Sequence, residues 1–141
     1  MSESLKWTQK SPEARIPTRG SEGSAGFDLY AYAPATLWPG CRLLVSTGIA
    51  CAIPAGWVGI IKPRSGLACK GITVDAGVID SDYRGEIKVL LVHHEGSAYS
   101  INMGDRIAQM VVVPYLAEAE VVGELPDTDR GDGAFGSTGM R

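Results

Sequence analysis

The sequence has 141 residues, a length that fits one domain, and 45% of them are hydrophobic, which is enough to build a core. The formal net charge of −3 argues against nucleic acid or an anionic membrane as the main partner, because both repel a protein of this charge. Three cysteines without a CxxC spacing, and no apolar run approaching about 18 residues, lead us to expect an intracellular protein, cytoplasmic or, in a eukaryote, also nuclear.

Short runs rich in Val, Ile and Leu are separated by Gly, Pro and Asp along most of the chain. None repeats with a period of about 3.6, and the sequence therefore predicts an all-β, single-domain jelly roll or β-sandwich over residues 1–125, with one short helical turn at 65–71. His93 and His94 end the third run and are expected in a solvated turn. Residues 126–141 are rich in glycine and are expected to form a flexible arm. The runs occupy residues 41–53, 56–63, 85–94, 106–116 and 119–125.

The first motif in chain order is SAGFDLYA, residues 24–31. In an alternating strand, Asp28 faces away from its apolar neighbours Phe27 and Leu29, so its carboxylate is available for another role. One interpretation is an Asp in contact with solvent. The other is a carboxylate that holds hydrated Mg²⁺, an ion that keeps several waters and takes few protein oxygens.

The second motif, PRSGLA at residues 63–68, brings a guanidinium, a hydroxyl and backbone N–H groups together at Arg64, Ser65 and Gly66. These groups suit a phosphate oxygen. Farther along, Arg106 and Gln109 interrupt an otherwise apolar run, and a buried amide at Gln109 needs partners. Both a satisfied core amide and a ligand contact fit Gln109.

Between these stretches, residues 77–85 read GVIDSDYRG and are followed by the strand-like GEIKVLLV. An apolar pair, a polar tip and a second apolar run predict a β-hairpin. Asp80 lies at the end of the apolar pair rather than in the polar tip, close to Tyr83, where a general base could be held still. A surface hairpin with an Asx-turn is the alternative.

The end of the chain, RGDGAFGSTG at residues 130–139, holds four glycines and a single aromatic residue. A glycine-rich backbone can wrap a polyphosphate with its N–H groups, while Arg130 supplies charge and the ring of Phe135 can lie on a flat base. A disordered tail is the alternative. The lone aromatic residue favours an arm that becomes ordered when a ligand binds.

Together these stretches resemble the five ordered motifs of the trimeric deoxyuridine triphosphatases (dUTPases). The resemblance implies a jelly-roll homotrimer with shared sites that hydrolyses dUTP to dUMP and pyrophosphate, by Mg²⁺-assisted attack of water on the α-phosphorus. The alternatives are a dCTP deaminase-like homologue and a non-catalytic module that senses dUTP or binds a protein partner. The motifs occupy residues 24–31, 63–68, 77–85, 104–112 and 130–139.

The resemblance also assigns roles to individual residues. Asp80 matches the carboxylate that activates the water, and Asp28 matches the one that orients Mg²⁺ through water. Tyr83 matches the aromatic residue that packs on the deoxyribose, and Lys88 falls where the returning strand closes the pocket. The uracil-reading backbone matches Val74, Gly77, Val78 and Ile79. The phosphate contacts match Arg64, Ser65, Gly66 and Gln109, and the mobile arm matches Arg130, Phe135, Gly136, Ser137 and Thr138.

Overall fold

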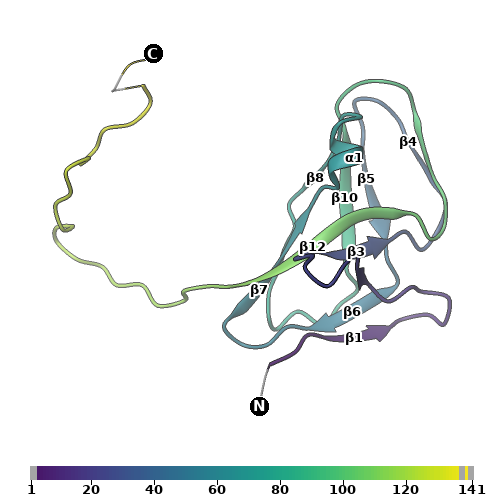
Figure 1. The fold of residues 1–141 in the computed structure, drawn as a ribbon, viewed down its shortest axis with the longest axis horizontal. Coiled ribbons are helices and arrows are strands. Elements are labelled where there is room, and N and C mark those ends of the chain that lie inside the picture. The colour runs from purple at the N-terminus through teal and green to yellow at the C-terminus, as the bar shows by residue number, and fades with distance from the viewer. Residues whose placement is uncertain (1–2, 137–138, 140–141) are drawn as a thin grey trace.

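The computed structural model describes residues 3–136 and 139. In this part of the chain the backbone forms twelve strands and one short helix (Figure 1). The prediction of an all-β domain with one helical turn is confirmed. In chain order the elements are β1 (Lys6–Gln9), β2 (Thr18–Arg19), β3 (Phe27–Tyr30), β4 (Ala35–Leu37), β5 (Arg42–Ser46), β6 (Ile49–Ala52), β7 (Trp57–Lys62), α1 (Ser65–Ala68), β8 (Ile72–Asp75), β9 (Val78–Ile79), β10 (Lys88–His93), β11 (Tyr99–Ile101) and β12 (Arg106–Pro114).

The strands pair antiparallel in four small sheets, and most partners are far apart in the sequence. The largest sheet has the order β2-β3-β12-β7-β9, in which β12 pairs with both β3 and β7 (Figure 1). A second sheet has the order β5-β10-β8, and the remaining pairs are β1-β6 and β11-β4. Pairing between distant segments is typical of a jelly roll and differs from a simple succession of hairpins.

Alternate residues of the strands fill the core. In β10, Val89, Leu91 and His93 point inward and are each at most 1% exposed, whereas Lys88 is exposed. Each buried Val or Leu side chain contributes about 1.5–3 kcal/mol by leaving water. His93 thus belongs to the core, and the expectation of a solvated turn is wrong for it. Its Nε2 donates to the carbonyl oxygen of Ser97 over 2.6 Å, whereas its buried Nδ1 has no hydrogen-bond partner within the described residues.

Residues 77–85 do not form the predicted β-hairpin. β9 pairs with β7, while β10 pairs with β5 and β8 in another sheet. The chain changes sheets between β8 and β9, at Ala76 and Gly77, where φ is 60° and 106°. Glycine is required at the second position because a Cβ there would lie 2.9 Å from the carbonyl oxygen of Ile61. The segment that carries Asp80 therefore connects the β5-β10-β8 sheet to the largest sheet and back.

The chain leaves the body after β12 and extends away from it (Figure 1). Residues 119–125, which were expected to form a strand, form none. Their apolar side chains face solvent instead: Val121 is 102% exposed and Leu125 is 82% exposed. Large apolar side chains exposed together on one segment are typical of an interaction surface. Among residues 3–136 and 139, no helix is long and apolar enough to cross a membrane.

Candidate active site

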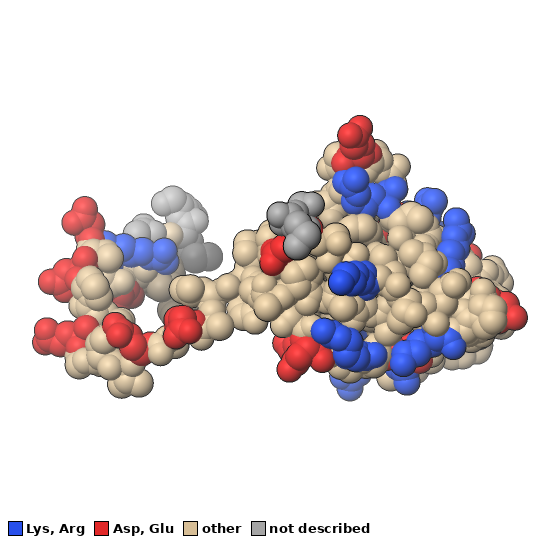
Figure 2. Space-filling view, turned by 90° about the horizontal axis from the view of Figure 1, so that it is seen from below, with Lys and Arg blue, Asp and Glu red and all other residues tan. Residues whose placement is uncertain are grey.

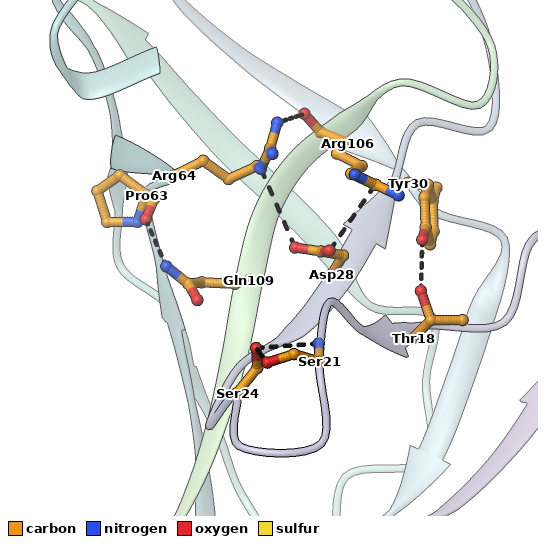
Figure 3. A network of polar contacts seen from close by, with 9 residues as sticks. All are labelled: Thr18, Ser21, Ser24, Asp28, Tyr30, Pro63, Arg64, Arg106 and Gln109. Carbon is orange, nitrogen blue, oxygen red and sulfur yellow. Dashed lines mark hydrogen bonds and ion pairs between the residues drawn. The ribbon is translucent and has the colours of Figure 1, made fainter. Parts of the chain in front are cut away.

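One acidic and two basic side chains meet where β3, β12 and the start of α1 come together (Figure 3). Oδ2 of Asp28 lies 3.7 Å from Nε of Arg106, and Oδ1 lies 4.0 Å from Nε of Arg64. Nη1 of Arg64 also donates to the carbonyl oxygen of Arg106 over 3.4 Å. The Asp28 side chain is 16% exposed, whereas those of Arg64 and Arg106 are 38% and 49% exposed. The carboxylate is thus the least exposed of the three groups, and both guanidiniums border solvent.

Gln109 lies directly opposite Asp28 in the β3–β12 pair, so the two side chains share one face of the sheet. Its Nε2 donates to the carbonyl oxygen of Pro63 over 3.0 Å, which ties β12 to the turn that carries Arg64. Gly26 makes room for this amide, because a Cβ at residue 26 would overlap Oε1 of Gln109. The Nε2 of Gln109 therefore has a partner, and its Oε1 accepts no hydrogen bond within the described residues.

These side chains border a cavity of about 290 Å³, which we call the anion pocket. Two guanidiniums against one carboxylate give its lining a positive charge, and planar guanidinium groups match the geometry of phosphate oxygens. The structure thus brings five of the sequence-predicted site residues into one place. The lining residues are Gly20, Ser24, Gly26, Asp28, Arg64, Ser65, Gly66, Arg106 and Gln109.

Asp80 follows β9 and borders a second cavity, of about 550 Å³. Its carbonyl oxygen accepts a hydrogen bond from the N–H of Tyr83 over 3.1 Å, which closes a turn. The hydroxyl of Tyr83 donates to the carbonyl oxygen of Glu86, and Arg84 donates to that of Ser81. The exposed carboxylate of Asp80 forms no ion pair within the described residues. The cavity is lined by Val58, Ile60, Val78, Asp80, Ser81, Asp82 and Tyr115.

The two cavities lie at opposite ends of β7. β9 runs antiparallel to β7, and Ile79 lies opposite Gly59. The next residue, Asp80, therefore lies beside Val58, near the start of β7. Arg64 lies just beyond the other end of the strand and is itself in an extended conformation. The step from Val58 to Arg64 spans about 20 Å of extended chain. One chain therefore does not bring Asp80 and Arg64 to the same phosphorus atom.

β9 is an edge strand of the largest sheet, so one side of its backbone has no strand partner. The carbonyl oxygen of Gly77 accepts a hydrogen bond from β7 over 2.8 Å and is already used within the chain. Val78 is 64% exposed and borders the same cavity as Asp80. Unpaired backbone groups at this edge could read the polar edge of a flat base. Val74 and Lys88, in the neighbouring sheet, border neither cavity.

Arg130, Phe135 and Gly136 line neither cavity and belong to the segment after β12, which extends away from the body (Figure 1). Phe135 is fully exposed, and φ is positive at Phe135 (53°) and Gly136 (85°). Nε of Arg130 donates to a carbonyl oxygen of its own turn over 2.7 Å. Acidic side chains gather on this segment and basic ones on the body (Figure 2). Ser137 and Thr138 lie outside the described residues.

A family model described as dUTPase matches residues 12–139. The chain belongs to the dUTPase family. Deoxyuridine 5'-triphosphate nucleotidohydrolases of monkeypox virus and Candida albicans are 46% and 47% identical to it, over 97% of this chain and 91% and 89% of those relatives. A dUTPase mutant of Staphylococcus bacteriophage 80alpha with dUpNHpp matches with a TM-score of 0.91 at 27% identity, over 99% of this chain and 100% of that one. A phage phi11 dUTPase mutant, studied for the coordination of a structural Mg(II) ion, matches with a TM-score of 0.80 at 27% identity, over 86% of this chain and 98% of that one.

The resemblance to dUTPases inferred from the motifs is thereby confirmed. Arg106 is the charged residue of this pocket to which the sequence reasoning assigned no site role, although it interrupts the apolar run. Side chains two residues apart in a regular strand point to the same face, so Ile107, and not Arg106, would share the pocket face with Gln109. The register shifts between Arg106 and Ala108, and this β-bulge turns Arg106 to the pocket face. The only signal in the sequence is that Arg106 is a charged residue at the head of an apolar run.

Proposed function

We propose that the protein hydrolyses dUTP to dUMP and pyrophosphate. The observation that carries this proposal is the anion pocket, in a chain whose relatives are named deoxyuridine 5'-triphosphate nucleotidohydrolases. The phosphates lie against Arg64, with Ser65, Gly66 and Gln109 donating or orienting further hydrogen bonds. Charge neutralisation and positioning are the main contributions a protein makes to phosphoryl transfer.

We propose further that three chains complete each site. The separation of Asp80 from Arg64 along β7 supports this arrangement, because both groups are needed at one α-phosphorus. The exposed apolar segment after β12 and the fully exposed ring of Phe135 support an arm that reaches a neighbouring chain. A closed ring of identical chains repeats one contact surface at every interface. A homotrimer then provides the anion pocket from one chain, Asp80 from a second and the arm from a third.

In the proposed reaction, Asp80 accepts a proton from a water molecule as that water attacks the α-phosphorus. The new P–O bond forms in line with the bond to the leaving pyrophosphate, which breaks and carries its electron pair to the departing oxygen. The ring of Tyr83 packs on the deoxyribose and leaves no space for a 2′-hydroxyl. Phe135 covers the uracil and Arg130 approaches the γ-phosphate, so the arm excludes water from the site.

Recognition of uracil is assigned to the free edge of β9. Uracil presents acceptor, donor and acceptor groups along its pairing edge, and cytosine exchanges the donor with one acceptor. Backbone groups that match uracil are left unpaired against cytosine, which allows discrimination on the order of 10⁴. Val78 and Ile79 are the residues whose backbone lies at this edge next to Asp80.

Mg²⁺ is proposed to arrive with the triphosphate. Within residues 3–136 and 139, no cluster of three His, Cys, Asp or Glu side chains could hold a metal ion. Asp28 is the one carboxylate among the described residues that borders the anion pocket, and it already faces two guanidiniums. The described residues therefore do not form a metal cage by themselves, whereas substrate phosphates are common Mg²⁺ ligands. Bound there, the ion neutralises phosphate charge; the family resemblance gives Asp28 a contact with it through water.

A pyrophosphate-release assay with dUTP, dTTP, dCTP and UTP in the presence of Mg²⁺ tests the proposed function. We expect turnover of dUTP, and rates for the other three nucleotides lower by orders of magnitude. Ammonia release from dCTP would support the dCTP deaminase alternative instead. Binding of dUTP without turnover would support the non-catalytic sensing module.

A further inference from the structure

The two ring nitrogens of His93 are in different situations, although the side chain as a whole is only 1% exposed. Nε2 donates to the carbonyl oxygen of Ser97 over 2.6 Å. Nδ1 is the one buried side-chain nitrogen or oxygen among the described residues that has no hydrogen-bond partner. The hydrogen bond to a carbonyl places the proton of the neutral ring on Nε2 and leaves a lone pair on Nδ1.

The hydrogen bond from His93 to Ser97 closes the segment between β10 and β11, residues 94–98, which we call the β10–β11 loop. Gly96 of this loop lies beside the imidazole, since a Cβ there would be 3.6 Å from Cε1 of His93. Its φ of 109° is a conformation that glycine adopts readily and other residues rarely do. Because the loop covers the ring, the loop has to lift before Nδ1 can meet solvent.

The β10–β11 loop also rests on the end of α1. The N–H of His94 donates to the carbonyl oxygen of Gly71 over 2.8 Å, and its Nε2 lies 2.8 Å from Oγ1 of Thr73. Gly71 packs closely against the loop, because a Cβ there would be 3.1 Å from the carbonyl oxygen of Glu95. The short segment 65–71 thus has the anion pocket at its first residue, Ser65, and this loop at its last.

A second proton on the imidazole has no compensating group among the described residues. It would turn Nδ1 into a buried N–H donor without an acceptor and would place a positive charge in the core. The residue opposite His93 on β8 is the apolar Ile72, and His93 takes part in none of the ion pairs of the described residues. Protonation therefore opposes the closed arrangement.

The titratable side chains on the elements around His93 are engaged elsewhere or exposed. Arg42 and Asp75 face each other over 3.9 Å, and Nζ of Lys70 lies 5.7 Å from the ring centre of Tyr99. Glu95, the carboxylate of the β10–β11 loop, is exposed and forms no ion pair within the described residues. The full set on these elements is Cys41, Arg42, Cys69, Lys70, Asp75, Lys88, His94, Glu95 and Tyr99.

From these contacts we propose that His93 is a pH-sensitive latch: the neutral imidazole holds the β10–β11 loop closed on the end of α1, and protonation at Nδ1 releases the loop. An exposed imidazole is half protonated at about pH 6.5, so the open loop takes up a proton that the closed loop does not accommodate. The closed loop is therefore favoured above this pH and loses ground as the pH falls. Linkage raises the ratio of open to closed loop by about tenfold between pH 7.5 and pH 5.5. The latch belongs to the fold and does not depend on the identity of the substrate.

Hydrogen exchange of single amides, followed by NMR on the full-length protein from pH 7.5 to pH 5.5, tests the latch. The reporter is the N–H of His94, whose hydrogen bond to Gly71 breaks when the loop lifts. We expect its protection factor, corrected for the intrinsic pH dependence of exchange, to fall by about tenfold over this range. The reference is the N–H of Ile61, bonded to Gly77 in the largest sheet, whose protection is expected to stay unchanged.

The two histidines of the chain provide a matched pair of variants. His93→Gln keeps a side-chain N–H donor for Ser97 but does not titrate, so protection at residue 94 should no longer depend on pH. His94→Gln removes the exposed imidazole alone, and the tenfold fall should remain. The latch is overturned if protection at residue 94 stays constant in the wild type, or if His93→Gln shows the same fall. Should His93→Gln fail to fold, His94→Gln still decides, because loss of the pH response in that variant would assign it to the wrong histidine.

Discussion

Asp80 is the residue on which the proposed chemistry depends, and its exposed carboxylate has no ion-pair partner among the described residues. Asp80→Asn keeps the size of the side chain and removes the proton acceptor. We expect kcat to fall by about 10²–10⁴, with the affinity for dUpNHpp preserved, because base and phosphates are held by other groups. Steady-state kinetics and calorimetry measure the two quantities. Glu95→Gln, which neutralises an exposed carboxylate outside both cavities, is the control; a wild-type kcat for Asp80→Asn would remove it from the role of base.

The variant Gly26→Ala tests whether the position of the Gln109 side chain in the anion pocket depends on the space left by Gly26. Its φ lies outside the left-handed region, so Gly26→Ala probes space alone. The new methyl group displaces the Gln109 amide from Pro63, and we expect kcat/KM to fall by about 10²-fold, as misplacement by about 1 Å can cause. Combining Gly26→Ala with Gln109→Ala removes the overlap with the amide and leaves only a 3.1 Å approach to Cβ of residue 109, so the melting temperature of the double variant should return most of the way to that of Gln109→Ala. Wild-type kinetics for Gly26→Ala would contradict this reading.

At the scale of the element, β6 shields one thiol from solvent. Burial raises the pKa of Cys51 above its ordinary value of 9.0, and the nearby charge of Arg84 only partly opposes this shift. The thiolate is the reactive form, so iodoacetamide at pH 8 should modify the exposed Cys41 and Cys69 and spare Cys51 until the protein unfolds. Because folding raises this pKa, the contribution of Cys51 to the free energy of unfolding is fully present below about pH 9. It is lost as the pH rises through the pKa of the folded protein. Equal labelling of all three thiols in the native state would contradict the assignment.

The C-terminal arm is the element that we propose reaches a neighbouring chain. Deletion of residues 130–141 removes Arg130 and the exposed ring of Phe135 but no buried side chain of the body. We therefore expect the melting temperature to stay within a few degrees of the wild type and kcat to fall by at least about 10²-fold. Phe135→Ala should show part of this loss if stacking on the base matters. A truncated protein with unchanged kcat would show that the arm takes no part in the reaction.

At the scale of the whole molecule, motif spacing predicted the anion pocket better than it predicted strand pairing. Arg64, Asp28 and Gln109 were identified as candidates because their types suit phosphate and metal chemistry, whichever strands carry them. The hairpin at 77–85 was wrong because the two-residue strand β9 carries too little pattern to choose β7 over β10. Arg106 was missed because a β-bulge reverses side-chain direction without a signature in the residue types.

The segment 119–125 shows a different limit of sequence reasoning. Its apolar pattern resembles that of a strand, yet Val121 and Leu125 face solvent in the single chain. Propensity indicates that such a segment favours an extended, paired state but does not say which chain supplies the partner. The distance between Asp80 and Arg64 likewise follows from the pairing of β9 with β7, a tertiary fact that no spacing of motifs contains.

Mixing two inactive variants tests most directly whether each active site is shared between chains. Asp80→Asn and Arg64→Gln are each expected to be inactive alone, because every site lacks either the base or a phosphate contact. After the two are unfolded together and refolded in equal amounts, random assembly into symmetric rings should give about one quarter of the sites an intact Asp80 from one chain and an intact Arg64 from its neighbour. We predict recovery of about one quarter of wild-type activity. Mixed trimers that form but remain as inactive as the separate variants would contradict the shared site.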